Sequence, residues 1–177
     1  MMILKVARMG HPVLRQMAEP VPPDQITSPD IQTFIDNLIE TMHEYDGAGL
    51  AAPQVHVSKQ IVVIEPGDRR QPFSDPDAET IVYINPEITP LTEEMDEDWE
   101  GCLSVPGLRG RVPRYTKIRF RAYDRHGQRL DLIAEGFAAR VIQHECDHLW
   151  GKLYIDRIRD TTSLTFIEEF MKYGIQE

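Results

Sequence analysis

The amino-acid sequence predicts an α+β fold in which antiparallel sheets pack around a central helix. Four strand-like segments follow one another between residues 60 and 135 instead of alternating with helices, which disfavours a doubly wound parallel sheet. One of these segments alternates apolar and basic residues, as a half-buried strand does. The central helix is expected directly after them, where the sequence reads QHECDHL (143–149). A chain of 177 residues can bury a sizeable core, so we expect one domain spanning residues 1–177.

The first predicted element is a helix that follows an irregular, proline-rich segment (10–29). Ser28 and Pro29 are suited to the N-cap and the first helical position. From Ile31 the apolar residues fall at positions 31, 34, 35, 38, 39 and 42, which is helical spacing. The helix should end near Asp46 and Gly47.

The strands and the remaining helices are predicted from composition and alternation. QIVVIEP (60–66) and TIVYINPEI (80–88) are β-branched and bounded by glycine or proline. YTKIRFRAYD (115–124) alternates cleanly, and HGQ (126–128) predicts a turn into a further strand, RLDLIAE. Two more helices are expected at about 137–149 and 163–173.

Composition and charge exclude several classes of protein. The net charge of −10 argues against a general DNA-binding protein and against a protein that coats anionic membranes. No apolar run reaches the length of a bilayer span, and the N-terminal segment lacks the unbroken apolar stretch of a signal peptide. Two cysteines are too few for a disulfide framework and favour a reducing compartment. We therefore expect a cytoplasmic protein, with an organelle matrix as the other option.

The sequence HECDH (144–148) predicts a metal site. His144 and His148 lie four residues apart and share one face of a helix, where both imidazoles can bind one ion. Glu145 between them is placed to handle a proton. Phe137 and Val141 continue the same face as an apolar wall. A catalytic site of this kind usually takes three protein ligands, so one ligand is missing from the motif.

Two kinds of third ligand are compatible with the sequence. The metalloprotease class with a third histidine is disfavoured, because Tyr154 occupies that position. A second class uses a glutamate on a later helix, which Glu168 or Glu169 could supply, although a solvated helix face explains both residues. The other candidate is Cys102 in the loop EGCLSVPG, where Gly101 permits close approach of the backbone.

Three segments together resemble the signature motifs of the peptide deformylase family. They are GAGLAAPQ (47–54), EGCLS (100–104) and QHECDHL (143–149), which match in residue type, internal spacing and order. GHPVLRQMAEPV near the start also resembles the N-terminal arm of that family. The resemblance implies a hydrolase that removes the formyl group from the N-terminal formyl-methionine of newly made proteins and releases formate.

The resemblance also implies the site residues. One divalent ion, Fe²⁺ in the cell with Zn²⁺, Ni²⁺ or Co²⁺ as substitutes, would be held by Cys102, His144 and His148. Glu145 would accept a proton from the attacking water and pass it to the leaving amine. The side-chain amide of Gln54 and the backbone N–H of Leu103 would donate to the formyl oxygen. The residues expected to contact the peptide are Gly47, Ala48, Gly49, Gly101, Phe137 and Val141.

Three other expectations concern alternatives and partners. Besides a deformylase, the motif allows a metallopeptidase with a downstream glutamate ligand, or a degenerate relative that binds metal or peptide ends without catalysis. Cys146 should be buried packing rather than a ligand. A transient contact with the ribosome, if there is one, should use Lys117, Arg119 and Arg121, because the C-terminal segment is short and acidic.

Overall fold

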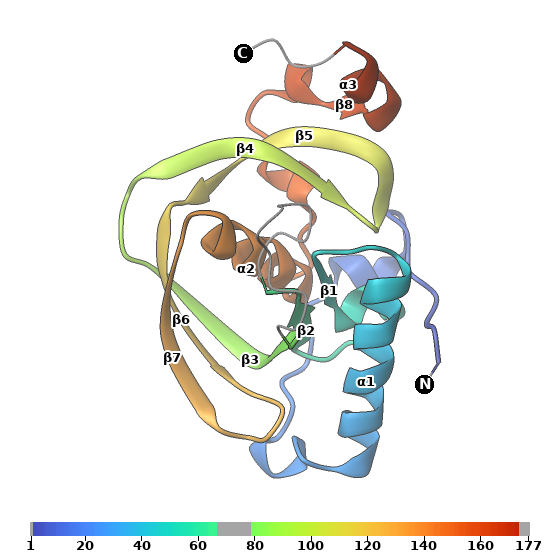
Figure 1. Ribbon diagram of the computed structural model, residues 1–177, viewed down its shortest axis with the longest axis vertical. Coiled ribbons are helices and arrows are strands. Elements are labelled where there is room, and N and C mark those ends of the chain that lie inside the picture. The colour runs from blue at the N-terminus through green and yellow to red at the C-terminus, as the bar shows by residue number, and fades with distance from the viewer. Residues whose placement is uncertain (1, 67–78, 174–177) are drawn as a thin grey trace.

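The computed structural model describes residues 2–66 and 79–173, and the predicted α+β fold with antiparallel sheets is confirmed. Figure 1 shows a helix, α2, enclosed between a curved sheet and a β-hairpin, with the longer helix α1 on the other side of the sheet. The helices are α1 (Pro29–Glu44), α2 (Gly136–Leu149) and α3 (Ile167–Tyr173). Short 3₁₀ turns at Pro12–Arg15, Pro23–Gln25, Ala52–Val55, Tyr154–Arg157 and Thr161–Ser163 connect the elements.

The larger sheet has five antiparallel strands in the order β1-β2-β3-β6-β7. Their bounds are Gly49–Ala51, Ile61–Ile64, Ile81–Pro90, Lys117–Tyr123 and Arg129–Glu135. The four strands predicted from composition are all present, with ends shifted by a few residues. The short strand β1 was not predicted, because three residues carry too little alternation to be recognised.

Both faces of β2 are buried because a helix packs on each side. Ile61 and Val63 belong to the apolar core that α1 completes, whereas Val62 and Ile64 belong to the core around α2. Successive side chains of a strand point to opposite faces, so one strand contributes to both cores. Cys146 is fully buried in the core around α2, which fits the prediction that it is a packing residue. Both cysteines are free thiols.

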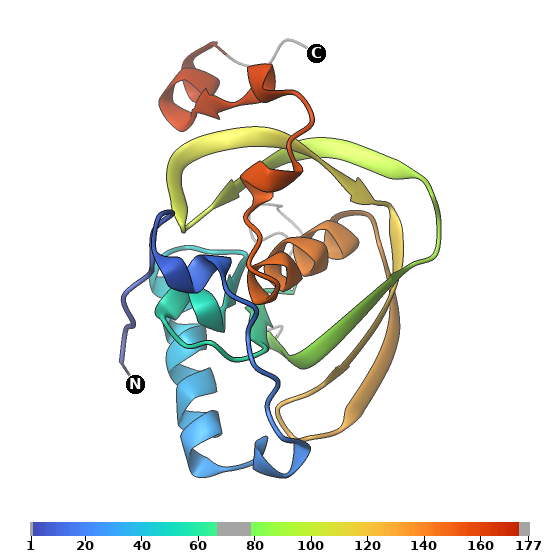
Figure 2. The same ribbon diagram turned by 180° about the vertical axis from the view of Figure 1, so that it is seen from behind.

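A second sheet covers the other side of α2. Strands β4 (Met95–Cys102) and β5 (Val105–Tyr115) form a long antiparallel hairpin, and β8 (Thr165–Phe166) adds to its edge. Figure 2 shows this hairpin arching over α2 on the side away from α1. Neither β4 nor β5 was predicted, since β4 is rich in acids and β5 contains two prolines, which are uncommon in strands.

The predicted helix at 163–173 is wrong in its first part. Ser163 ends a 3₁₀ turn whose N-cap, Asp160, accepts a hydrogen bond from the backbone N–H of Thr162. Thr165 and Phe166, which form β8, are extended because they pair with Arg109 and Leu108 of β5. Only Ile167–Tyr173 is helical, so a tertiary contact overrides the local pattern. Among the described helices, none combines the length and apolar character that crossing a bilayer requires.

Gly151 ends α2 in a conformation that only glycine adopts without strain. Its φ is +69°, and a Cβ atom there would lie 2.8 Å from the backbone carbonyl group of Arg15. Gly127, in the turn between β6 and β7, has a similar φ of +77°, but a Cβ atom at that position would meet no other atom within 4 Å. Alanine at Gly127 would therefore meet backbone strain alone, whereas alanine at Gly151 would meet both backbone strain and a steric clash.

We expect Gly151→Ala to destabilise the protein more than Gly127→Ala. The left-handed conformation costs an L-residue about 1–2 kcal/mol at either position. At Gly151 the clash with the backbone of Arg15 should add about 1–3 kcal/mol, because two backbone segments must separate. The free energy of unfolding from urea denaturation measures both, and equal losses in the two variants would contradict the packing role of Gly151.

Candidate metal and catalytic centre

The α2 helix and the tip of the β4–β5 hairpin bring three metal-binding side chains together. One ligand atom each from Cys102, His144 and His148 lies within 4.8 Å of the others. The Cys102 Sγ atom is 3.4 Å from Nε2 of His148, and the two imidazole rings have centroids 5.2 Å apart. Glu168 and Glu169 lie on α3 and are not members of this group. Cys102 is therefore the third ligand.

This donor set fits a single divalent ion. Thiolates and imidazoles are both usual ligands of catalytic sites that bind an ion through three protein side chains and leave a fourth position open. Nε2 of His148 faces the sulfur, while its buried Nδ1 has no hydrogen-bonding partner among the described residues. The convergence of three such donors, two of them from one helix turn, identifies a metal-binding site without identifying the metal.

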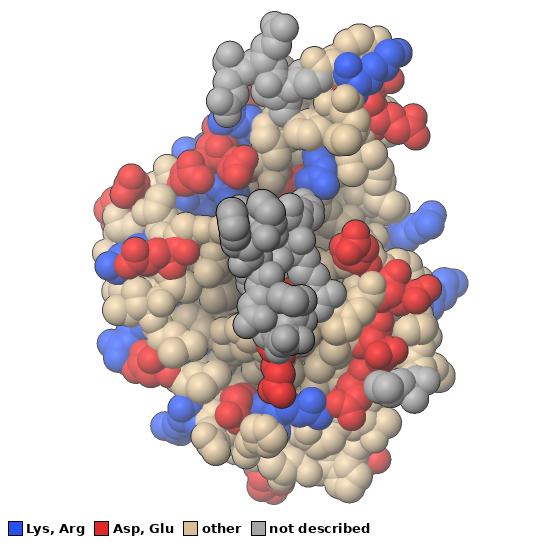
Figure 3. All heavy atoms as spheres, in the orientation of Figure 1, with Lys and Arg blue, Asp and Glu red and all other residues tan. Residues whose placement is uncertain are grey.

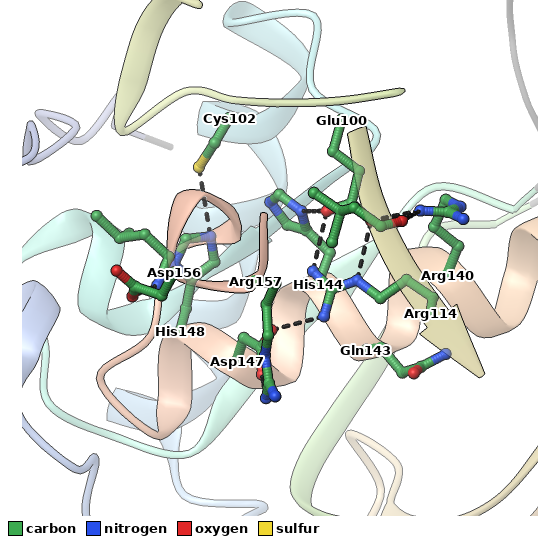
Figure 4. Close-up of polar contacts among 12 residues, drawn as sticks. Glu100, Cys102, Arg114, Arg140, Gln143, His144, Asp147, His148, Asp156 and Arg157 are labelled. Atoms are coloured by element: carbon green, nitrogen blue, oxygen red, sulfur yellow. Dashed lines mark hydrogen bonds and ion pairs between the residues drawn. The ribbon is translucent and has the colours of Figure 1, made fainter. Parts of the chain in front are cut away.

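Glu100 fixes the orientation of His144. One carboxylate oxygen of Glu100 lies 2.8 Å from Nδ1 of His144, which leaves Nε2 of that ring for the ion (Figure 4). Arg114 donates two hydrogen bonds to the same carboxylate, and Arg140 donates a third. Burial alone would raise the pKa of Glu100, but its hydrogen bonds with Arg114 and His144 outweigh burial and hold the pKa well below its usual range. The carboxylate is therefore charged and selects the tautomer of His144.

The network continues from Arg114 to Asp147 on α2. Arg114 donates to Asp147 at 2.6 Å, and Arg157 donates to the same carboxylate from the following 3₁₀ turn. Glu100, Arg114 and Asp147 are all buried. Buried ion pairs cost desolvation energy that roughly offsets their attraction, so their main effect is to define geometry. They join β4, β5 and α2 at the metal site.

Glu145 is buried beside the metal ligands. Its side chain is 5% exposed, and its Oε2 atom has no hydrogen-bonding partner among the described residues. Burial raises the pKa of Glu145 to about 7, against the opposing effect of His144. A carboxyl group that changes protonation state near neutral pH can both accept and donate a proton.

Gln54 presents its amide group to the same site. Its Oε1 atom accepts a hydrogen bond from the backbone N–H of Ala51, so the NH₂ group points the other way. Nε2 lies 3.5 Å from Sγ of Cys102 and 3.2 Å from Oγ of Ser104. The side chain is buried, and its donor is therefore held in a fixed direction next to the metal ligands. Leu103 follows Cys102 at the wall of the same cavity.

A cavity of about 930 Å³ opens over these residues. Its wall includes all the residues that the family resemblance implied for catalysis, metal binding or peptide contact apart from His148, which is buried. The lining residues from that set are Gly47, Ala48, Gly49, Gln54, Gly101, Cys102, Leu103, Phe137, Val141, His144 and Glu145. Phe137 is 44% exposed at the first turn of α2, so its ring stands at the mouth.

Comparison with known proteins gives the same family from sequence and from structure. Residues 3–163 match the family model described as polypeptide deformylase. The chain belongs to the polypeptide deformylase family. Peptide deformylase 2 of Ralstonia nicotianae is 48% identical over 168 residues, which cover 94% of this chain and 93% of the relative. Peptide deformylase 1 of Nitrosomonas europaea is 51% identical over 162 residues, covering 90% and 89%.

Solved deformylase structures match over most of their length. The class I type b peptide deformylase of Acinetobacter baumannii, bound to Met-Ala-Ser, has a TM-score of 0.82 at 37% identity, covering 89% of this chain and 99% of that one. The deformylase of Thermotoga maritima has a TM-score of 0.81 at 37% identity, covering 90% and 100%. The chain is thus a metal-dependent hydrolase that removes the N-formyl group from nascent peptides, and a metallopeptidase with a glutamate ligand is excluded by the position of Cys102.

Sequence reasoning missed the residues that support the deformylase ligands. Glu100, Arg114 and Asp147 were not singled out, although Glu100 directly precedes the Gly-Cys pair and Asp147 stands next to His148. Acidic residues this close to metal-binding residues are the available signal, because a ligating histidine usually donates its second ring N–H to a carboxylate or carbonyl.

Gly49 has a steric task that the sequence did not reveal. A Cβ atom at this position would lie 2.5 Å from Oε1 of Glu145 and 2.7 Å from its Cγ and Cδ atoms. The absent side chain therefore leaves the space that the carboxylate occupies. At Gly101, by contrast, the nearest atom to an added Cβ would be 3.6 Å away, in the side chain of Arg109.

We expect Gly49→Ala to lower kcat strongly while the metal stays bound. The methyl group would displace the carboxylate of Glu145, and losing a positioned general base typically costs about 100-fold or more. Gly101→Ala should change mainly KM, because its methyl group fits without moving Glu145. Steady-state kinetics with metal analysis distinguishes them, and a Gly49→Ala enzyme with unchanged kcat would refute the steric role.

Proposed function

We propose that the chain deformylates the formyl-methionyl ends of nascent peptides with Fe²⁺ as its native ion, and that residues 1–177 form a single catalytic domain. The single observation that supports the catalytic roles best is the placement of Glu145 and Gln54 on the walls of one cavity with the metal ligands Cys102 and His144. Zn²⁺, Ni²⁺ or Co²⁺ should substitute, because the same donors suit all of these ions.

The reaction is proposed to follow from the positions of the side chains. A divalent ion bound by the three ligands would supply Lewis acidity and lower the pKa of water in its open position. Glu145, with its raised pKa, would accept the proton of the attacking water and later pass it to the leaving amine. The amide of Gln54 and the backbone N–H of Leu103 would donate to the formyl oxygen as negative charge develops there. A donor aimed in this way typically contributes about 3–4 kcal/mol.

The peptide is proposed to bind in an extended conformation between two glycine-containing edges. Gly47, Ala48 and Gly49 line the cavity at the start of β1, and Gly101 lines it from β4. Backbone groups at such edges can pair with an added strand. The relative from Acinetobacter baumannii was solved with Met-Ala-Ser bound, which supports a peptide in this cleft. Phe137 and Val141 would then face the methionine side chain.

We propose a cytoplasmic location, because two free cysteines fit a reducing compartment.

Transient ribosome contact through the basic face of β6, formed by Lys117, Arg119 and Arg121, stays a prediction. Lys117 pairs with Glu135 on β7, and Arg119 and Arg121 both pair with Asp131. Figure 3 shows basic and acidic side chains side by side at the left of the molecule, where β6 and β7 lie in Figure 1. These pairs reduce the charge available to RNA phosphates, and co-sedimentation with ribosomes at low and high salt tests the contact.

Formate release from a formyl-Met-Ala-Ser peptide tests the proposed function. The protein should be prepared without oxygen and loaded with Fe²⁺ or Ni²⁺, since a thiolate ligand and Fe²⁺ both oxidise readily. We expect stoichiometric formate and a free methionyl amine. The acetylated peptide of the same sequence is the control, and absence of formate from a metal-loaded protein would contradict the proposal.

Glu145→Gln should keep the metal but lose most of the rate. The amide is nearly isosteric with the carboxylate but cannot accept a proton, so kcat should fall by about 100-fold to 10,000-fold. Cys102→Ala should instead lose stoichiometric metal, whereas Glu168→Ala should retain both metal and activity. Metal analysis together with formate release separates these results. A metal-loaded Glu145→Gln protein with near wild-type kcat would remove Glu145 from the mechanism.

A further inference from the structure

Strand β7 forms an open edge of the larger sheet. It is the last strand in the order β1-β2-β3-β6-β7, and among the described strands it pairs only with β6. Figure 1 shows it at the outer margin of the molecule, and none of its residues lines the catalytic cavity. The free edge of a strand presents backbone N–H and C=O groups with which another strand can pair.

The hydrogen bonds at the two ends of β7 show which of its backbone groups face outward. The N–H of Gly136 donates to the carbonyl oxygen of Thr116 at one end. At the other end the N–H of Asp124 donates to the carbonyl oxygen of Gln128. Even-numbered positions therefore point toward β6, and the pairing between the two ends runs without a shift in register. Because successive residues of a strand alternate in direction, the backbone groups of the odd-numbered residues point away from β6. These residues are Arg129, Asp131, Ile133 and Glu135.

The same edge exposes two large apolar side chains. Leu132 is 44% exposed and Ile133 is 62% exposed, whereas Phe120, which lies opposite Leu132 on β6, is fully buried. The strand contains no proline, and no bulge interrupts its pairing with β6. Prolines and bulges are two of the devices that commonly keep an edge strand from pairing with another chain.

The charges of β7 favour a second copy of the same strand as its partner. In an antiparallel pair about a two-fold axis at Leu132, Arg129 would lie opposite Glu135, and Asp131 opposite Ile133. All four are outward-facing residues, so their backbone groups can exchange hydrogen bonds. Shifting one strand by two residues would instead place Asp131 opposite Asp131 or Glu135 of the second copy, and like charges directly opposite are destabilising. A shift by one residue would set outward-facing groups against inward-facing ones.

The two charged residues of this cross-strand pair already have partners that leave them exposed. Glu135 is 63% exposed and lies 2.8 Å from Lys117 on β6. Arg129 donates to the hydroxyl group of Tyr123 at 3.1 Å, and its guanidinium carbon lies 5.5 Å from the centroid of that ring. In the two-fold arrangement each Glu135 would lie between Lys117 of its own chain and Arg129 of the second copy. The charges along this row alternate in sign.

We propose that β7 pairs antiparallel with β7 of a second copy of this chain, in the register centred on Leu132, so that two five-stranded sheets become one continuous sheet. The two Leu132 side chains meet at the axis, and Ile133 flanks it on either side. One strand pair buries less surface than a permanent interface, so the dimer is reversible. Both catalytic cavities stay open in it, because β7 lines neither. The inference holds whatever the metal and the reaction.

Sedimentation equilibrium of the Ni²⁺-loaded full chain tests the dimer. From about 1 μM to about 1 mM protein, the mass of the wild type should rise from 20.4 kDa toward twice that value. Arg129→Glu and Glu135→Arg each set like charges opposite at two symmetric positions, so each should weaken the dimer by about 10-fold. The double variant restores opposite charges and should dimerise as the wild type does.

Glu168→Arg is the matched control, because it makes the same change of charge on an exposed residue of α3. It should dimerise as the wild type does, and circular dichroism should show that every variant is folded. A wild type that stays at 20.4 kDa over the whole range would overturn the proposal. A double variant as weak as the single variants would also overturn it, because lost contacts with Lys117 and Tyr123 within one chain would then explain the effect.

Discussion

The geometry of the metal site depends on one buried carboxylate, that of Glu100. It accepts hydrogen bonds from Arg114 and Arg140 and contacts Nδ1 of His144. The two oxygen atoms of this carboxylate therefore link β4 to β5 and to α2. The same strand carries Cys102 two residues later. Any displacement of β4 against α2 would therefore move the thiolate and the imidazole together. Because an unpaired charge in this interior would cost several kcal/mol, the network permits only a narrow range of arrangements.

The β1 strand and the turn that follows it help to position the two side chains that we propose to act in catalysis, Glu145 and Gln54. The β1 strand pairs with β2 and packs against α2, and the absence of a side chain at Gly49 leaves room for the carboxylate of Glu145. The 3₁₀ turn that follows β1 carries Gln54, whose amide is held by the backbone of Ala51. Residues of β1, of the β4–β5 hairpin and of α2 thus all line one cavity. This arrangement keeps the proposed proton acceptor, Glu145, and the proposed amide donor, Gln54, fixed relative to the metal ligands before substrate arrives.

Local sequence patterns predicted the elements whose apolar spacing repeats over several turns or residues. α1, α2, β6 and β7 all have such patterns. The HECDH motif identified two ligands because helical spacing alone puts His144 and His148 on one face. The hairpin of β4 and β5 could not be predicted in this way, since its buried charged residues depend on distant partners, as Arg114 does on Glu100 and Asp147. The extended residues before α3 depend likewise on β5, and the steric role of Gly49 depends on Glu145, a side chain distant in the sequence.

The most direct test of this account is the affinity of Glu100→Gln for Ni²⁺, measured by competition with a chromophoric chelator. Glu97→Gln is the control, because Glu97 lies exposed on the same strand and its carboxylate is outside the network. Circular dichroism should first show that both variants are folded. We expect Glu100→Gln to bind Ni²⁺ about 10-fold to 100-fold more weakly than the wild type, since the amide holds the ring of His144 less firmly, while Glu97→Gln remains unchanged. Wild-type affinity in a folded Glu100→Gln protein would contradict the central role of this carboxylate.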